Sequence, residues 1–327
     1  MKNPFVTNGY VSPEYFCDRE KETAKIVSLL TNENNIALIS PRRLGKTDLL
    51  RHCFGQPEIK EHYHTFIIDI YATSSVRDFV NVFGKAVLDE LRPKGKSVWS
   101  TFLNVLASLR SEITFDMNGQ PTWGIGLGAI TNPSATLDEI FSYLNNAGKP
   151  CLIAIDEFQQ ITKYADDPNI EAALRTHIQR CSNAHFVFSG SHRHLMGAMF
   201  TSPTRPFYQS VTLINLPPIS VDKYAEFCLK HFERASKLLD TLVVTELYER
   251  FNGITSYMQK VMNILFSMTG TGEICIPSMI DTAINDLLDF SADTYDALLY
   301  QMPEKQRIVF MAIAAEGKAK AISSGGF

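Results

Sequence analysis

Short apolar runs alternate with longer amphipathic stretches over the first two thirds of the chain. Runs of this kind are typical of strands buried on both faces of a sheet. They lie at residues 35–40, 66–70, 151–155, 186–189 and 211–216. Helical patterns precede the first run, at residues 20–30, and separate later runs, from Lys46 onward and at residues 76–91 and 136–147. Strands that alternate with helices predict an α/β fold with a parallel sheet.

One segment interrupts this alternation. Ile113 and Phe115 alternate with polar positions, Asn118-Gly119 follows, and a second alternating stretch includes Trp123. Asn-Gly between two alternating stretches is a strong signal for a β-hairpin. We therefore predict a β-hairpin inserted into the α/β core at residues 112–127.

The pattern changes after Pro217-Pro218. Residues 221–300 are helical in pattern throughout, with helix stops at Asn252-Gly253 and Thr269-Gly270. We therefore predict two domains followed by the start of a third module. They comprise an α/β core at 1–217, an all-helical domain at 218–300, and a last segment at 301–327 that opens with an amphipathic helix after Pro303.

Composition and charge narrow the class of protein. The 327 residues include 31 Lys and Arg and 35 Asp and Glu, for a net charge of −4, which disfavours broad electrostatic contact with DNA. No apolar run approaches the roughly 18–20 residues of a membrane span, and the first ten residues lack the apolar core of a signal peptide. Six scattered cysteines without a CxxC pair are typical of buried free thiols. We expect a cytoplasmic protein without membrane contact.

Gly45-Lys46-Thr47 is the core of a Walker A loop. The three residues follow a buried strand and open a helix, which is the context that the motif requires. The helix start offers backbone N–H groups and a positive dipole end to phosphate. We expect Lys46 to reach the β- and γ-phosphates and the Thr47 hydroxyl to ligate Mg²⁺. The other candidate nucleotide-binding residues of this stretch are Pro41, Arg42, Arg43, Leu44 and Asp48.

Two features of this loop leave alternatives open. Ser40 occupies the place of the first glycine of the full motif, which costs little if the backbone there suits a residue with a Cβ. Arg42 and Arg43 either add positive charge for phosphate or point into solvent.

A pair of carboxylates, Asp156-Glu157, ends the apolar run at 151–155. Open α/β sheets bind ligands at the carboxyl ends of their strands. Asp156 fits the role of holding Mg²⁺, and Glu157 that of a general base that polarises an attacking water. The alternative, that the pair only caps the next helix, is disfavoured by the Walker A loop upstream. The guanine-reading motif of GTPases fails at Ala165, so ATP and ADP are the expected nucleotides.

Residues 40–47, Ser-Pro-Arg-Arg-Leu-Gly-Lys-Thr, resemble the PRRxGKT loop of the archaeal-type ATPases, which are AAA-related signal-transduction ATPases often grouped with the STAND class. Further boxes of that family resemble residues 15–20, 152–159, 188–191 and 251–255. The resemblance covers about residues 10–315. It implies a P-loop NTPase sheet of the additional-strand Glu class, in which another strand separates the Walker A and Walker B strands, a helical lid, and a C-terminal winged helix.

The resemblance also assigns roles to single residues. Arg19 would approach the base or ribose of the nucleotide, and Ser189 or Ser191 would sense the γ-phosphate. Arg205 would be an arginine that assists catalysis, unless it is a plain surface arginine. Two boxes depart from the family pattern, because Asp18 replaces a glycine and Thr255 replaces the proline of the lid. The predicted catalytic set is therefore Lys46, Glu157, Ser189, Ser191 and Arg205.

The last segment resembles the start of the family's winged helix. The sequence ends at Phe327, before a recognition helix would form, so either the chain is a fragment or this module is degenerate.

Three functions are compatible with these patterns. The main hypothesis is an ATPase that hydrolyses ATP to ADP and phosphate with Mg²⁺ and couples this to motion of the lid. An alternative is a slow nucleotide-dependent switch that docks a protein partner through the hairpin or associates with itself. A third is a DNA-associated ATPase that uses the winged helix, which the net charge does not favour.

Overall fold

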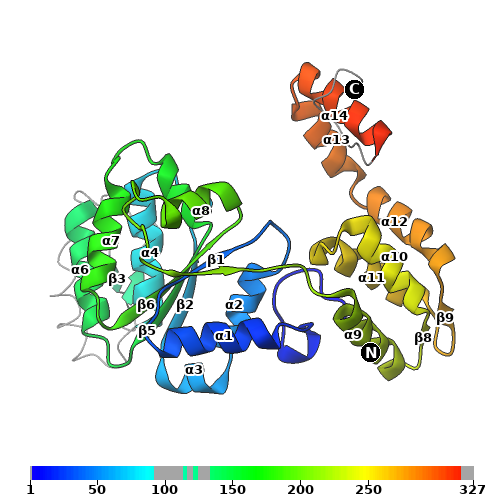
Figure 1. Ribbon diagram of the computed structural model, residues 1–327, viewed down its shortest axis with the longest axis horizontal. Coiled ribbons are helices and arrows are strands. Elements are labelled where there is room, and N and C mark those ends of the chain that lie inside the picture. The colour runs from blue at the N-terminus through cyan, green and yellow to red at the C-terminus, as the bar shows by residue number, and fades with distance from the viewer. Residues whose placement is uncertain (1, 92–112, 116–120, 124–132, 318–327) are drawn as a thin grey trace.

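Five parallel strands form the central sheet of the protein (Figure 1). The computed structural model describes residues 2–91, 113–115, 121–123 and 133–317. The strand order is β2-β5-β6-β1-β7. The strands are β1 (Ile36–Ile39), β2 (His64–Asp69), β5 (Cys151–Asp156), β6 (Ala184–Gly190) and β7 (Thr212–Asn215). The predicted parallel sheet is confirmed, and β6 separates the Walker A strand β1 from the Walker B strand β5, as the resemblance implies.

Helices cover both faces of this sheet, because the strands are apolar on both sides. In β1, Ile36 and Leu38 pack into one buried cluster while Ala37 and Ile39 pack into the other. This division reflects the two-residue period of a strand. The first cluster includes α1 (Glu20–Thr31), α2 (Lys46–Phe54) and α3 (Pro57–His62). The second includes α4 (Val76–Glu90), α6 (Pro133–Asn145), α7 (Ile170–Arg180) and α8 (Arg193–Thr201).

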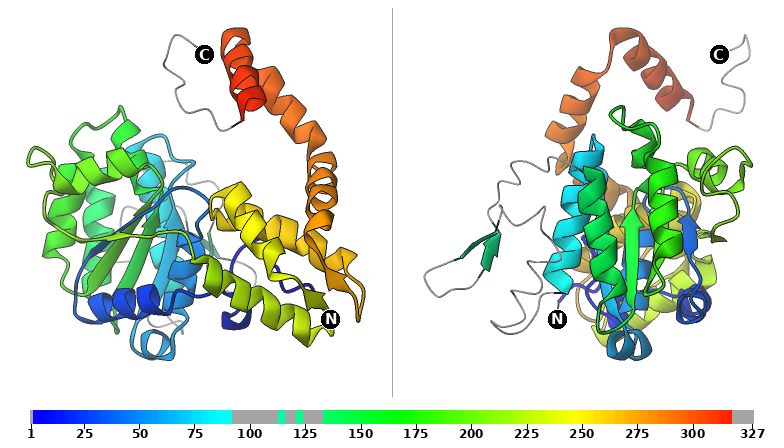
Figure 2. Two further views of the ribbon diagram at one scale, coloured as in Figure 1. Left: turned by 45° about the vertical axis from the view of Figure 1, so that its right-hand side comes forward. Right: turned by 90° about the vertical axis from the view of Figure 1, so that its left-hand side faces the viewer.

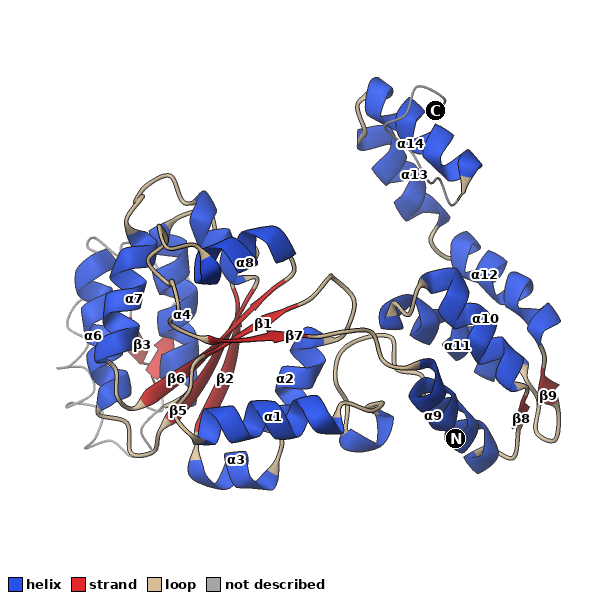
Figure 3. Cartoon of the chain, in the orientation of Figure 1, coloured by secondary structure: helices blue, strands red, loops and turns tan. Residues whose placement is uncertain are grey.

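A second domain, mostly helical, follows β7 and has its own buried cluster (Figure 3). Its helices are α9 (Val221–Arg234), α10 (Thr241–Phe251), α11 (Thr255–Met268) and α12 (Ile280–Asp289). The expectation of an all-helical domain needs one correction. Strand β8 (Leu238–Leu239) pairs in parallel with β9 (Ile274–Cys275). Two-residue strands are too short to leave a periodic pattern in the sequence.

The start of the N-terminal segment packs on the helical domain. Phe5 is fully buried there, with its ring against Phe227, Phe232 and Phe266. The Asn263 side chain donates a hydrogen bond of 2.7 Å to the Phe5 carbonyl. A short helix, η1 (Pro13–Tyr15), lies between this anchor and α1. The first residues of the range 1–217, which was predicted for the α/β domain, therefore pack into the hydrophobic core of the second domain. A single buried phenylalanine leaves no periodic pattern in the sequence that would predict this contact.

The inserted hairpin is present where the structure describes it. Strands β3 (Ile113–Phe115) and β4 (Pro121–Trp123) pair antiparallel, and Ile113 lies opposite Trp123. The Asn118-Gly119 turn and the end of the predicted hairpin lie outside the described residues.

A helical arm leaves the second domain after α12 (Figures 1 and 2). It consists of α13 (Ala292–Gln301) and α14 (Glu304–Glu316), neither of which has a buried residue. The helix expected after Pro303 is present, and residues 318–327 lie outside the described residues, so the winged helix stays a prediction. None of the helices described is long and apolar enough to cross a membrane.

All six cysteines are buried free thiols, as expected.

Candidate functional site

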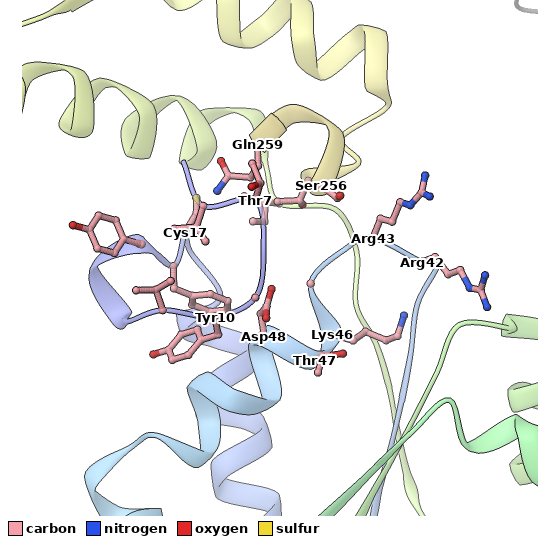
Figure 4. Close-up of a pocket in the computed structure, with 18 of the residues that line it drawn as sticks. Thr7, Tyr10, Cys17, Arg42, Arg43, Lys46, Thr47, Asp48, Ser256 and Gln259 are labelled. Atoms are coloured by element: carbon pink, nitrogen blue, oxygen red, sulfur yellow. The ribbon is translucent and has the colours of Figure 1, made fainter. Parts of the chain in front are cut away.

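A cavity of about 430 Å³ lies where the carboxyl edge of the sheet meets the second domain (Figure 4). Three parts of the chain enclose it. The loop between β1 and α2 and the end of β5 form one side, the N-terminal segment forms another, and the start of α11 faces both. Its lining includes Arg42, Arg43, Gly45, Lys46, Thr47, Asp48, Asp156 and Glu157. The Walker A and Walker B residues predicted from the sequence therefore meet in one cavity.

The backbone of the β1–α2 loop explains its residues. Gly45 is the N-cap of α2 and has a left-handed φ of 83°, which glycine adopts without steric cost. Gly45 has no side chain to cap the helix, so the first-turn N–H groups are left for a ligand. Ser40 has no positive φ, so it is tolerated in the place of a glycine. Its side chain is buried.

The Lys46 ammonium lies inside this loop. Its Nζ donates to the carbonyls of Ser40 at 3.0 Å and Pro41 at 3.1 Å. Burial lowers the pKa of Lys46 from its ordinary value, and the nearby carboxylates of Asp156 and Glu157 oppose this shift. The ammonium is thus held between two backbone oxygens of the loop.

Thr47 and Asp156 are in direct contact. The Thr47 hydroxyl donates to Asp156 Oδ2 at 2.5 Å, while Asp156 Oδ1 accepts from the backbone N–H of Glu157 at 3.0 Å. One hydroxyl and one carboxylate are the hard oxygen ligands that Mg²⁺ takes from a protein when phosphates complete the shell. The donor set therefore fits Mg²⁺. Among the described residues no cluster of three His, Cys, Asp or Glu side chains fits a metal.

The Glu157 carboxylate is held by two donors on its Oε2 atom. Ser191 Oγ donates at 2.8 Å and Gln159 Nε2 at 2.5 Å. Arg42 Nε in turn donates to Ser191 Oγ at 3.3 Å, and the Arg42 guanidinium lies over the ring of Tyr71. Glu157 precedes the short helix η3 (Phe158–Lys163) but does not cap it with its side chain. Its side chain is therefore directed to the site and not to helix capping.

Six predicted site residues do not line the cavity, namely Arg19, Pro41, Leu44, Ser189, Ser191 and Arg205. Ser189 is fully buried in β6, and its hydroxyl has no hydrogen-bond partner. Arg205 pairs with Glu171 at 2.5 Å, and burial raises the pKa of Glu171 while Arg205 opposes this. Arg19 is buried with a φ of 78°, and bonds Glu22 and the carbonyl of Pro217 at 2.7 Å. Their assigned roles stay predictions.

The N-terminal segment supplies a wall of the cavity that the sequence analysis missed. The lining residues from this segment are Val6, Thr7, Gly9, Tyr10, Val11, Tyr15, Phe16 and Cys17. His52 of α2 holds this wall, because its Nδ1 lies 3.0 Å from the Tyr10 hydroxyl and its ring stacks on Phe16. Burial raises the pKa of Asp48, and Arg51 and the Tyr10 backbone oppose this shift. Gly9 and Pro13 are typical of turns, so the sequence of this segment does not predict a contact with the site.

The second domain, here called the lid, touches the loop between β1 and α2, here called the phosphate loop, directly. The backbone N–H of Ser256 donates to the carbonyl of Arg43 at 3.2 Å. The Arg43 guanidinium lies 4.8 Å from the centroid of the Tyr257 ring. Gln259, which also lines the cavity, accepts a hydrogen bond of 2.9 Å from the Tyr224 hydroxyl. Two contacts, both with Arg43, therefore join the first turn of α11 to the β1–α2 loop beside the cavity.

Comparisons with known proteins agree with this architecture. The model of an ATPase domain found predominantly in Archaea matches residues 16–261. A search of curated proteins finds no match.

Two solved structures have the same fold at low identity. A Walker-type ATPase of Pyrococcus abyssi is 17% identical with a TM-score of 0.62, over 91% of this chain and 79% of that chain. The Aeropyrum pernix ORC1 protein, solved in complex with DNA, is 11% identical with a TM-score of 0.59, over 94% of this chain and 74% of that one.

Proposed function

Since the chain belongs to the family of ATPase domains found predominantly in archaea, we propose that it binds ATP in the 430 Å³ cavity and hydrolyses it to ADP and phosphate. The observation that carries this proposal is the meeting of Thr47, Asp156 and Glu157. Thr47 bonds Asp156, and Glu157 follows Asp156 in the chain and lines the same cavity. A hydroxyl, a metal-binding carboxylate and a second carboxylate are the groups that phosphoryl transfer to water requires.

The phosphate loop is the proposed site of the triphosphate. It concentrates Arg42, Arg43 and Lys46 at the start of α2 in a chain whose net charge is −4. The helix dipole and the first-turn N–H groups add to this attraction. Lys46 would exchange its two carbonyl contacts for phosphate oxygens, which restores charge pairing to a buried ammonium.

Thr47 and Asp156 are the residues that would hold Mg²⁺. The ion neutralises phosphate charge when bound. Both side chains already lie within 2.5 Å of each other, so little rearrangement is needed to share one ion.

Glu157 is the proposed general base. Its Oε2 carries both of its hydrogen bonds, from Ser191 and Gln159. Within the described chain its Oε1 has no bond, so this atom is available to accept a proton from water. Ser191 links the base to Arg42 on the phosphate loop, which supports the sensing role assigned to it.

The test is a comparison of nucleotide binding with turnover. Wild type is expected to be stabilised thermally by ATP or ADP with Mg²⁺ more than by GTP, because a ligand that binds only the folded state raises the melting temperature. Glu157→Gln should keep that stabilisation and lose about 10²–10⁴-fold in kcat, the usual contribution of a general base.

Glu61→Gln is the control, because the Glu61 side chain is exposed. The control should turn over ATP at the wild-type rate. Full activity of Glu157→Gln would contradict the assignment of the base, and a melting temperature that no nucleotide raises would contradict the cavity as the site.

A slow switch is the second candidate, favoured by the contacts of Ser256 and Tyr257 with Arg43. In this version ADP–ATP exchange moves the lid, and hydrolysis only resets it. Retained ADP and a single slow turnover would favour the switch, whereas fast steady turnover would favour the ATPase.

A DNA-associated role has weaker support, because the net charge of the chain is −4. Salt-sensitive binding of DNA by the protein would be the observation that supports it.

A further inference from the structure

Gln159 is a buried amide that contacts the proposed base. Its side chain is 3% exposed, and its Nε2 donates to Glu157 Oε2 at 2.5 Å. It does not line the cavity, so its effect on hydrolysis would pass through Glu157. Building on the ATP hydrolysis proposed above, we infer that Gln159 is a positioning residue that fixes the Glu157 carboxylate for water activation.

The chemistry of the contact fixes the orientation of the amide. An ionised carboxylate only accepts hydrogen bonds, so the NH₂ group of Gln159 must face Glu157. The amide oxygen Oε1 then turns toward β6, where it is buried without a hydrogen-bond partner. A buried unpaired oxygen is costly, so stability alone would favour an apolar side chain at this position.

Gly190 makes room for this amide. A Cβ at Gly190 would lie 2.4 Å from Gln159 Oε1 and 2.6 Å from Met196 Cγ. Gly190 is not among the residues with a positive φ, so its backbone does not require glycine. Glycine is required here because the Gln159 side chain occupies the space that a Cβ would take. The absence of a side chain at Gly190 therefore allows Gln159 its position.

The two donors to Glu157 come from different elements. Gln159 belongs to η3, which follows β5, while Ser191 follows β6. Together they hold Oε2 from two sides and leave Oε1 without a bond in the described part of the chain. A carboxylate held in one rotamer is preorganised for proton transfer. The unpaired Gln159 oxygen is the stability cost of that arrangement.

The first test replaces the amide by an apolar side chain of similar shape. Gln159→Met should lower kcat about 10- to 100-fold, because a misplacement of about 1 Å costs a catalytic group about 100-fold. The dissociation constant of ATP should change less than about twofold, since Gln159 does not line the cavity. The melting temperature should stay the same or rise, because the unpaired oxygen is removed.

The neighbouring Gln160 provides a matched control. It also donates a side-chain hydrogen bond, to the carbonyl of Thr73 at 2.9 Å, away from Glu157. Gln160→Met should therefore keep the wild-type kcat and lower the melting temperature. Should Gln159→Met fail to fold, Gly190→Ala displaces the amide without removing it and should lower kcat in the same way.

A double variant separates positioning from a general structural effect. On the Glu157→Gln background, Gln159→Met should cause no further loss of kcat, because residues that act through one group are not additive. Losses that multiply, or an unchanged kcat in a folded Gln159→Met, would each overturn the inference. A wild type without ATP turnover defeats the proposed function and this inference together, whereas an active wild type that Gln159→Met does not slow defeats the inference alone.

Discussion

Thr47 and Asp156 are 109 positions apart in the sequence, yet their side chains meet at 2.5 Å. The sequence predicted each of them from its own neighbourhood, a buried strand followed by a phosphate loop or by a carboxylate pair. It predicted the meeting only through the rule that parallel strands present their carboxyl ends at one edge. That rule does not predict the hydrogen bonds of Glu157 with Ser191 and Gln159, because these depend on how the side chains of η3 pack against the end of β6.

The histidines make the stability of the protein depend on pH. Burial lowers the pKa of His52, His177, His185 and His231 below the ordinary value. A lowered pKa means that the unfolded chain binds more protons than the folded one, so stability falls as the pH drops below about 6.5. His231 is fully buried, next to the ring of Phe227 and facing Arg234, Lys230 and Glu14.

We therefore expect the melting temperature of the wild type to fall between pH 7.5 and pH 5.5, measured without nucleotide. His231→Phe should reduce this slope, because an aromatic ring remains and the titrating group is gone. His62→Phe, at an exposed histidine, should leave the slope as it is. Equal slopes in all three proteins would exclude His231 as a source of the effect.

At the scale of elements, the lid helix α11 is joined to the phosphate loop by few contacts. The Arg43 guanidinium lies over the Tyr257 ring, and the Arg43 carbonyl accepts from Ser256 N–H. Helix α1 is joined to the linker before α9 by Arg19, which bonds the Pro217 carbonyl. The family resemblance assigns Arg19 to the nucleotide, and that role stays a prediction; in the structure Arg19 also links these two elements.

We expect Tyr257→Leu to weaken ATP binding about two- to fivefold, because a cation–π contact at a partly exposed site contributes about 0.5–1 kcal/mol. Tyr257→Phe keeps the ring and should bind ATP as the wild type does. Isothermal titration with ATP and Mg²⁺ measures both affinities. Equal weakening in the two variants would mean that the hydroxyl, and not the ring over Arg43, is the group that matters.

At the scale of the whole molecule, the N-terminal segment unites the two domains. Phe5 fills the core of the helical domain, Tyr10 forms a wall of the cavity, and Arg19 opens α1 on the sheet. The N-terminal segment, whose sequence has no regular periodicity, thus contributes both to the core of the helical domain and to the wall of the cavity.

Phe5→Ala should therefore lower both stability and ATP affinity. Removing a buried phenylalanine costs about 3–5 kcal/mol, and the wall that follows Phe5 loses its anchor. Leu242→Ala, at a side chain that is 61% exposed, should change stability by about 0.5 kcal/mol or less. Thermal unfolding with and without ATP checks both effects, and a destabilised Phe5→Ala that binds ATP normally would separate the anchor from the site.

The helical arm is the other large-scale feature. Tyr300 and Ile308 are among its exposed side chains, at 85% and 61%, and Phe290, just before the arm, is 82% exposed. The sequence predicted a helix after Pro303 but not that α13 and α14 bury nothing among the described residues. Amphipathic pattern shows that a helix has an apolar side; only the assembled fold shows whether that side has a partner.

The sequence by itself determined the parallel α/β sheet, the phosphate loop and the carboxylate pair. Each is encoded locally, because a buried strand, a glycine at a helix start and a polar residue at a strand end leave patterns within a few residues. Tertiary structure alone decided that residues near Tyr10 close the cavity, that Gln159 and Ser191 hold Glu157, and that Arg19 binds Pro217. Those contacts join residues from separate elements of the fold. Which side chains meet depends on how the elements pack together, and the local pattern of apolar and polar residues does not contain that information.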